Sequence, residues 1–470
     1  MKSYGHAVTL TAPTAGPRPR LLSPTYAVTT IGMFALVAFA AFEATAVTTV
    51  MPTVARELDG VGLYALSFAA PLASGVVGMV AAGARSDRRG PVAPLLVALV
   101  LFAIGLVVCG TAPSMEVLVV GRVLQGLGGG AVTVCLYVVV GLVFPAILQP
   151  AVFASFAAAW VLPSLFGPAL AALVAHAVGW RWVFLGVVAL VAASTLLVVP
   201  ALRALEPRDG DAQPARSRLA WAVVGATAVL ALELLGSRRG ATVGLAVVAL
   251  GVVVLSLRRL LPAGALVARR GLPAVIGTRG LLSASFFCAE AYIVFVLQDR
   301  WGLSPGTAGL ALTAVGIVWA GSSQVQARLG DRVSDVAAMR WGTALVLVGT
   351  AALVAVVVAD GAALLAMAAY VVAGAGMGFG YPRTGVAMLA ASTASDRGFN
   401  SSALSIADSL GGALALSLSG IVFGVVTRLG GDPFASVFVL ATGIAVLGVV
   451  TAARTAARVE ARGTAGGPAV

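Results

Sequence analysis

Long apolar runs, separated by short charged stretches, make up most of this chain. Of its 470 residues, 60% are hydrophobic and only 10% are charged, whereas a soluble protein carries about 25% charged residues. So little charge does not cover a globular surface, and disorder requires low hydrophobicity, so both classes are excluded. The runs are continuous rather than alternating, which indicates an all-α polytopic membrane protein.

The number of such runs predicts fourteen transmembrane spans, since each spanning helix needs about 20 mostly apolar residues. The two runs between 219 and 257 are the shortest, and Arg238 and Arg239 lie between them. The fourteen predicted spans are 27–51, 61–83, 92–110, 115–139, 150–176, 181–202, 219–236, 241–257, 280–298, 305–326, 341–359, 361–382, 401–427 and 434–455.

Basic residues concentrate on one side of these predicted spans. An even number of spans places both termini on the same side, and that side holds 23 of the 30 basic residues, against 6 on the other, with Arg122 inside a span. The positive-inside rule therefore predicts cytoplasmic termini. Lys2 is the single lysine, which we interpret as the composition of a high-GC bacterium, so we expect the bacterial inner membrane. The net charge of +12 then reflects orientation rather than a nucleic-acid partner.

An internal repeat divides the chain into two halves. Asp87–Arg88 and Asp331–Arg332 both end a predicted helix, and glycine-rich stretches recur at 126–130 and 374–380, with offsets of 244 and 248 residues. Two related halves around a midplane site are the pattern of secondary transporters. We expect a cytoplasmic tail at 1–26, a six-helix bundle at 27–202, linkers and two extra transmembrane helices at 203–279, a second six-helix bundle at 280–455 and a cytoplasmic tail at 456–470.

Four stretches carry the residue spacing of a known transporter family. They are Gly83, Asp87, Arg88 and Gly90 (motif A), Arg122, Gln125 and Gly126 (motif B), Gly167 and Pro168 (motif C), and Glu43, Thr45 and Pro52 in the first span. Through them the chain resembles the major facilitator superfamily, specifically its fourteen-span drug:proton antiporters. Departures from the family pattern are Glu43 for the usual Asp, Pro91 for a basic residue of motif A, and Pro163, Ala171 and Ala172 for glycines of motif C.

This resemblance implies two six-helix bundles plus two extra helices, which alternate access to a central site. It implies proton-coupled efflux of amphipathic, cationic or neutral drugs or antibiotics, with protons, the substrate and the lipid bilayer as partners and with a monomeric protein. Motif C implies export. A proton-coupled importer and an exporter of lipids or lipid-linked glycans stay open on the same fold. The sequence contains no H-E-x-x-H pattern, no His/Cys cluster and no ATP-binding loop motif, so we expect no enzyme, metal or cofactor.

Five ionisable residues fall within predicted spans, where each costs at least about 2.5 kcal/mol and is therefore a candidate functional residue. They are Glu43, Arg122, Glu233, Glu290 and Asp408. Burial favours the neutral form of a carboxyl group and a nearby cation favours its charged form. We expect Glu43 to carry a proton with Arg122 as its partner, because Arg122, Gln125 and Gly126 share one helical face. The glycine lets another helix approach that face closely.

The remaining acids suggest a site for a cation. Glu290 lies among aromatic residues, with Tyr292 two positions on, and such surroundings suit a lipophilic cation through charge and cation–π contact. Trp160 and Trp319 fall inside spans rather than at their ends, so we expect them in a cavity wall. Asp408, among serines, is a candidate for both proton coupling and substrate binding. Glu233 has no assigned role. In motif A, we expect Asp87 to lie beside a helix N-terminus and Arg88 to pair across the two bundles.

Overall fold

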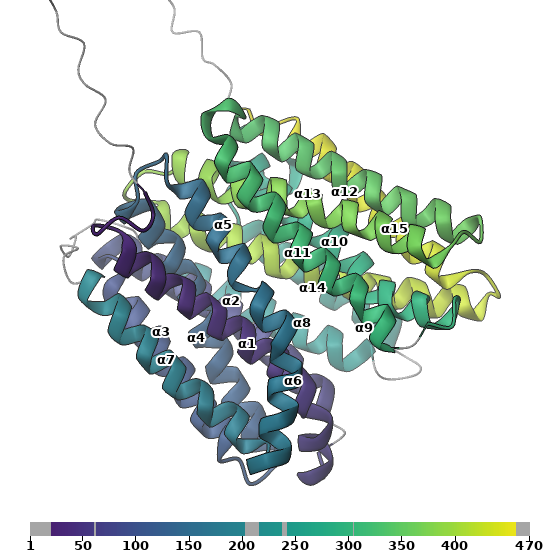
Figure 1. Cartoon of the computed structure of the whole chain (residues 1–470), viewed down its shortest axis with the longest axis horizontal. Coiled ribbons are helices and arrows are strands. Elements are labelled where there is room, and N and C mark those ends of the chain that lie inside the picture. Colours follow the sequence, from purple (N-terminus) through teal and green to yellow (C-terminus); the bar gives the residue numbers. More distant parts are fainter. Residues whose placement is uncertain (1–19, 61–62, 203–215, 237–241, 304, 457–470) are drawn as a thin grey trace, which may run out of the picture.

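Helices form the whole of the described chain. The computed structural model describes residues 20–60, 63–202, 216–236, 242–303 and 305–456, and these contain no strand (Figure 1). The α-helices are α1 (Ala27–Glu57), α2 (Tyr64–Arg89), α3 (Val92–Gly110), α4 (Met115–Val143), α5 (Gln149–Ala159), α6 (Val161–Val178), α7 (Arg181–Leu202), α8 (Arg216–Gly236), α9 (Thr242–Leu260), α10 (Leu272–Asp299), α11 (Pro305–Leu329), α12 (Asp335–Val358), α13 (Ala363–Ala390), α14 (Arg397–Arg428) and α15 (Pro433–Ala452). Two short 3₁₀ helices, η2 (Ala265–Val267) and η3 (Gly330–Arg332), lie in connections.

Helix ends follow local chemistry. The Asp432 side chain accepts a hydrogen bond from the backbone N–H of Ala435 and precedes Pro433, which suits the first position of α15 because its missing N–H would be unpaired there in any case. The Ser334 hydroxyl caps α12 in the same way. Gly90 ends α2 with φ of 79°, a left-handed conformation that glycine adopts without a steric penalty.

Two groups of helices form two halves (Figure 1). α1 to α7 lie together in the lower left of the view and α10 to α15 in the upper right, while α8 and α9 pack on each other and α8 packs on α2. Between the halves, α2 and α4 contact α14, and α5 contacts α11 and α13. The described chain thus confirms the predicted all-α fold.

The fourteen-span count is not confirmed. Twelve stretches of the described chain are long and apolar enough to cross a membrane, and neither α8 nor α9 is among them. Arg216 and Arg218 occupy the first turn of α8, and Arg258 and Arg259 the last turn of α9, which shortens the apolar part of each. The twelve stretches are Ala27–Met51, Leu66–Arg89, Val92–Gly110, Met115–Val143, Gln149–Gly167, Arg181–Val198, Leu272–Asp299, Thr307–Leu329, Asp335–Val358, Ala363–Ala390, Arg397–Arg428 and Pro433–Ala452.

Two boundaries differ from those expected. The predicted span 150–176 is divided at Trp160 into α5 and α6, because the backbone N–H of Trp160 bonds to a carbonyl three residues back, as at a helix end. The helix α10 begins at Leu272, before the predicted start of its span at 280, so Arg279 belongs to α10 and not to a loop.

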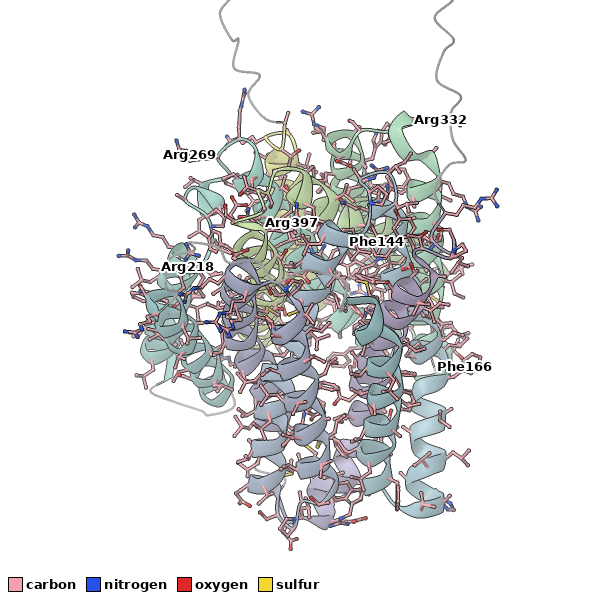
Figure 2. All side chains as sticks on the ribbon, turned by 90° about the vertical axis from the view of Figure 1, so that its left-hand side faces the viewer. Phe144, Phe166, Arg218, Arg269, Arg332 and Arg397 are labelled. Atoms are coloured by element: carbon pink, nitrogen blue, oxygen red, sulfur yellow. The ribbon has the colours of Figure 1, made fainter. Side chains whose placement is uncertain are left out.

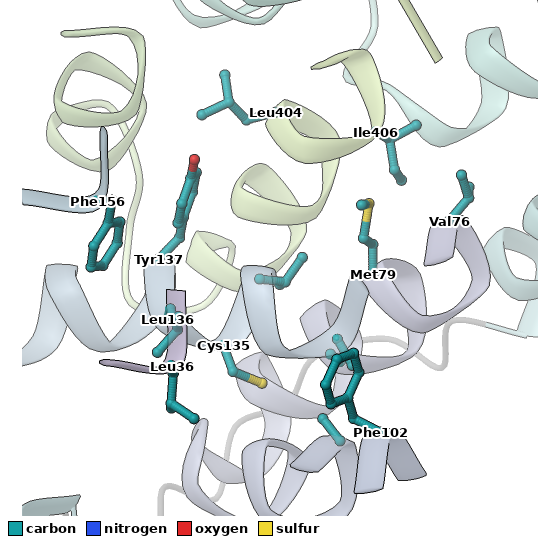
Figure 3. Packing of buried hydrophobic residues seen from close by; sticks show 14 of the residues in the cluster. Leu36, Val76, Met79, Phe102, Cys135, Leu136, Tyr137, Phe156, Leu404 and Ile406 are labelled. Atoms are coloured by element: carbon teal, nitrogen blue, oxygen red, sulfur yellow. The ribbon is translucent and has the colours of Figure 1, made fainter. Parts of the chain in front are cut away.

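One hydrophobic core joins the halves. It contains residues of α1 to α7 together with Leu404 and Ile406 of α14. In Figure 3, Ile406 lies close to Met79 and Val76 of α2, and the Tyr137 ring on α4 points its hydroxyl toward the side where Leu404 lies. A second core lies within α10 to α15. Large apolar side chains also cover outward faces, as at Phe166 (Figure 2), which suits contact with lipid.

Candidate functional site

A buried ion pair joins α1 to α4. Arg122 Nη1 donates to Glu43 Oε1 over 2.5 Å, and the two residues are only 6% and 8% exposed. Gln125 Nε2 donates to the same carboxylate oxygen (3.1 Å), while its own Oε1 accepts from Arg122 Nη1 (3.0 Å). Arg122 Nε donates to the carbonyl of Ser67 on α2 (3.0 Å). The structure therefore brings together the acid and the arginine that the sequence suggested as partners.

Motif B owes its position to close helix packing. A Cβ atom at Gly126 would lie 2.5 Å from Pro71 Cα on α2, and one at Gly128 would lie 2.5 Å from Phe102 N on α3. α4 therefore sits against both backbones, which larger side chains would prevent. This packing fixes the height at which Arg122 meets Glu43.

Motif C approaches the same helix α1 from α6. Thr45 Oγ1 donates to the carbonyl of Pro163 over 3.4 Å, and a Cβ atom at Gly167 would lie 2.5 Å from that hydroxyl. Thr45 is two residues from Glu43, so motif C packs against the part of α1 that carries the acid. Pro168 lies in α6, but its side chain is outside the described residues.

Motif A connects the two halves. Asp87, near the end of α2, accepts hydrogen bonds from the backbone N–H groups of Gly398 (2.5 Å) and Phe399 (2.8 Å), in the first turn of α14. The carboxylate therefore occupies the N-terminus of a helix in the other half, where the helix dipole favours it. The expected cross-bundle contact exists, but Asp87 makes it; Arg88 is exposed and no carboxylate of the described residues lies within ion-pair distance. A Cβ atom at Gly83 would lie 2.5 Å from the Gly398 carbonyl.

Sequence reasoning missed Arg279, the largest fully buried side chain of the described chain. Its Nε donates to Asp408 Oδ1 (3.0 Å), and its guanidinium lies 3.1 Å from the centre of the Tyr381 ring. Arg279 Nη2 donates to the hydroxyl of Tyr137 (2.9 Å), which belongs to α4 in the other half. The count of basic residues on each side of the membrane placed Arg279 in a loop, because the predicted span began at 280.

Asp408 is already engaged by several donors. Besides Arg279, the Tyr381 hydroxyl donates to its Oδ2 (2.7 Å), and the Ser283 hydroxyl donates to Oδ1. All of its partners lie in the second half. Arg383, also counted as a loop residue, is buried in α13 and pairs with Asp335 over 2.7 Å.

Glu290 has quite different surroundings from those two paired carboxylates. It is half-buried on α10, and the Tyr370 hydroxyl of α13 lies beside it. This hydroxyl and the indole N–H of Trp319 are both buried without a hydrogen-bond partner among the described residues. Phe286 joins the two rings, with its centre 5.3 Å from that of Tyr370 and 5.2 Å from that of Trp319. Glu290 thus forms no ion pair with a described residue, and it lies beside Tyr370, one of the three rings of this aromatic cluster.

The other candidate residues lie elsewhere. The Tyr292 ring stacks on Phe423 at 5.2 Å, in an aromatic cluster distinct from that of Trp319. Trp160 is 47% exposed at the break between α5 and α6. Glu233 lies in α8, but its side chain is outside the described residues.

Known proteins resemble this chain in sequence and in fold. A sequence profile of the Major Facilitator Superfamily matches residues 33–296. A probable multidrug-efflux transporter of Mycobacterium tuberculosis is 27% identical over 442 residues, which cover 85% of this chain and 88% of that protein. An efflux transporter of Aspergillus oryzae is 38% identical over 159 residues, covering 32% of this chain and 28% of that protein.

Solved structures of low sequence identity share the fold. A human organic anion transporter superposes with a TM-score of 0.70 at 13% identity, covering 92% of this chain and 100% of that one. A bacterial homologue of the iron transporter ferroportin, in an outward-facing state, gives 0.67 at 11% identity, covering 90% and 97%. With two helical halves and a profile match over more than half of its length, the chain belongs to the Major Facilitator Superfamily of membrane transporters.

Proposed function

We propose that this transporter exports amphipathic cations in exchange for protons, with Glu43 as the proton site and Glu290 as the cation site. One observation carries the proposal: the two acids occupy equivalent places in the two halves but have different partners. Glu43 and Glu290 are 247 residues apart, and Arg122 and Tyr370 are 248 apart. These offsets agree with that of the glycine-rich repeat, and each acid lies on the first helix of its half with its partner on the fourth.

The different partners give the two acids different chemistry. Arg122 is permanently charged, and it holds the Glu43 carboxylate in an ion pair. A proton bound at Glu43 cancels that attraction, and Arg122 then keeps only its bonds to Gln125 and Ser67. α1 and α4 are therefore held together more weakly when Glu43 is protonated. A proton can bias alternating access only if it changes the relative stability of the two conformations, and this change in helix contact does so.

No described cation pairs with Glu290, so a substrate can supply one. Phe286, Trp319 and Tyr370 present aromatic rings within the same region, and a ring face attracts a cation most strongly where water is excluded. The indole N–H of Trp319 also offers a buried donor to a polar group of the substrate. These features support an amphipathic cation better than an anion.

Hydrogen bonds between the halves hold one end of the molecule closed. Named contacts between the halves lie at the end that carries η3 and the start of α14: Asp87 with α14, Tyr137 with Arg279, and Gln324 Nε2 with the Ala154 carbonyl over 3.2 Å. We propose that this end is cytoplasmic, in the inner membrane of a bacterium, and that a single chain suffices. The relative named as a multidrug-efflux transporter agrees with export.

Two variants at one position test the cation site. In proteoliposomes with an imposed pH gradient, we expect Tyr370→Arg to abolish transport of a cationic dye such as ethidium, because the new guanidinium neutralises Glu290 as Arg122 neutralises Glu43. Glu290→Gln should lose the same transport, whereas Tyr370→Phe, the matched control, should retain it. Undiminished ethidium transport by Tyr370→Arg would contradict the assignment. If the wild type moves no cation at all, the importer or the lipid exporter on this fold becomes the better account.

We further propose that α8 and α9 cross the membrane as a hairpin beside α2, as in the fourteen-span subgroup. Their packing supports this, since a Cβ atom at Gly225 would lie only 3.0 Å from Ser256 Cβ. A cysteine replacing Ser237, between the two helices, should react with an impermeant reagent only from the side opposite the termini. Labelling from the side of the termini would contradict the hairpin span.

A further inference from the structure

A basic cavity lies away from the transport site, where α10 begins and α15 ends. Its volume is about 470 Å³, and Val267, Ala268, Arg269, Arg270 and Arg454 line it. Three of these five residues are arginines and none is acidic. The cavity belongs to neither of the two acid sites described above.

Backbone contacts shape this cavity. The loop between α9 and α10 turns back through η2, with Gly264 and Gly271 at φ of 90° and 87°. The backbone N–H of Gly271 donates to the Arg454 carbonyl (3.1 Å), and Arg454 Nη1 donates to the Val267 carbonyl (3.4 Å). The loop is thereby tied to the end of α15, which brings the three lining arginines, all exposed, to one place on the surface.

Positive charge in this cavity is not balanced by the described part of the chain. Arg300 pairs with Asp432 and Arg383 with Asp335, but no described carboxylate lies within ion-pair distance of Arg269, Arg270 or Arg454. Arg340 adds a further cation next to the cavity, since it donates to the Ala453 carbonyl over 3.1 Å. Guanidinium groups brought together repel each other, and an anion that they share relieves this repulsion. Planar donor forks match the oxygens of a phosphate group.

The cavity lies level with the ends of two membrane-spanning stretches, and therefore at the expected membrane surface. The spanning stretches Leu272–Asp299 and Pro433–Ala452 begin and end beside it, which places it at the level of lipid headgroups. Leu266 and Val267, in η2, are 50% and 67% exposed, so apolar side chains face outward next to the arginines. Figure 2 shows Arg269 at the same end of the molecule as Arg332.

We propose that this cavity binds the phosphate-bearing headgroup of an anionic phospholipid. Its volume lies within the range of about 300–1,000 Å³ typical of small-molecule sites. A headgroup with part of its glycerol fits such a space and brings acyl chains to Leu266 and Val267. Basic pockets beside transmembrane helices on the cytoplasmic side recognise such headgroups, and the positive-inside rule places this end in the cytoplasm. The proposal does not depend on which substrate is transported.

Lipid titration of the full-length protein tests this site. In detergent, native mass spectrometry should detect phosphatidylglycerol bound more tightly than phosphatidylcholine. The triple variant Arg269→Gln, Arg270→Gln, Arg454→Gln should bind phosphatidylglycerol on the order of a hundredfold more weakly, from about fivefold for each arginine. A matched triple variant at Arg85, Arg328 and Arg332, all exposed, should bind as the wild type does.

Each outcome decides the proposal. If the cavity variant keeps the preference for phosphatidylglycerol, the site is wrong. If millimolar inorganic phosphate displaces the lipid from the wild type, the cavity is a site for soluble anions and the lipid assignment is overturned. The single variant Arg454→Gln guards against misfolding, because its backbone carbonyl still accepts from Gly271; a fivefold loss there, with unchanged size-exclusion behaviour, supports the proposal.

Discussion

Removing Arg122 provides a quantitative test of the buried ion pair. In Arg122→Gln the carboxylate of Glu43 loses its 2.5 Å contact and keeps only the 3.1 Å bond from Gln125. Breaking a buried pair by removing one partner costs about 3–5 kcal/mol, because the remaining charge stays buried without compensation. We therefore expect the free energy of unfolding of Arg122→Gln to fall by about 3 kcal/mol near pH 8.

A double-mutant cycle isolates the pair. Glu43→Gln leaves Arg122 with Gln125 and Ser67 as acceptors, so its cost should be smaller than that of Arg122→Gln. Because the two side chains contact each other, the costs of the single variants should not add in Glu43→Gln, Arg122→Gln. We expect a coupling energy of about 1–3 kcal/mol, within the range for contacting residues. Denaturant unfolding in lipid nanodiscs, followed by tryptophan fluorescence, measures all four proteins. Additivity within about 0.5 kcal/mol would refute the ion pair.

Three further predictions concern contacts between helices. Asp87→Asn should weaken the contact between the halves at the closed end by about 1.5–3 kcal/mol, since hydrogen bonds to a charged group are worth that much. Distances between spin labels at positions 89 and 395 should then lengthen. Unchanged distances would count against this role of Asp87. Tyr137→Phe removes the hydrogen bond from Arg279 across the halves and should shift the same distances in the same direction. Tyr26→Phe, at the residue that precedes α1, serves as a control. At the opposite end, burial of Asp432 raises its pKa, but the Ala435 N–H and Arg300 outweigh burial and lower the pKa below the usual 3.8. The ionised Asp432 therefore stabilises the folded protein above that pH, and this stabilisation is lost as the pH falls further. The fall in melting temperature on acidification should therefore be smaller in Asp432→Asn than in the wild type.

Fold class and the first acid site were accessible from the sequence. Apolar runs and low charge predicted helices across a membrane, and the helical spacing of Arg122, Gln125 and Gly126 predicted the face that meets Glu43. These features depend on local periodicity and composition, which a sequence displays directly. Arg122 could be predicted as the partner of Glu43 because it was the one basic residue inside a predicted span, and a buried carboxylate needs a cation nearby.

Contacts between the halves were less accessible. Arg279 escaped notice because hydropathy places helix ends only approximately, and a charged residue near an end counts as a loop residue. The partner of Asp87 lies 311 residues away along the chain, and no local pattern marks it. Tyr370, in contrast, was within reach, because the 248-residue offset of the glycine-rich repeat leads from Arg122 directly to it.

Proton and dye fluxes measured together test the central claim most directly. In proteoliposomes that contain a pH-sensitive probe, wild-type protein should move ethidium against its gradient when protons flow the other way, and reversal of the pH gradient should reverse the movement of the dye. Glu43→Gln should abolish this coupling while ethidium still binds with near wild-type affinity. Dye movement that ignores the pH gradient, or full coupling in Glu43→Gln, would contradict proton exchange at Glu43.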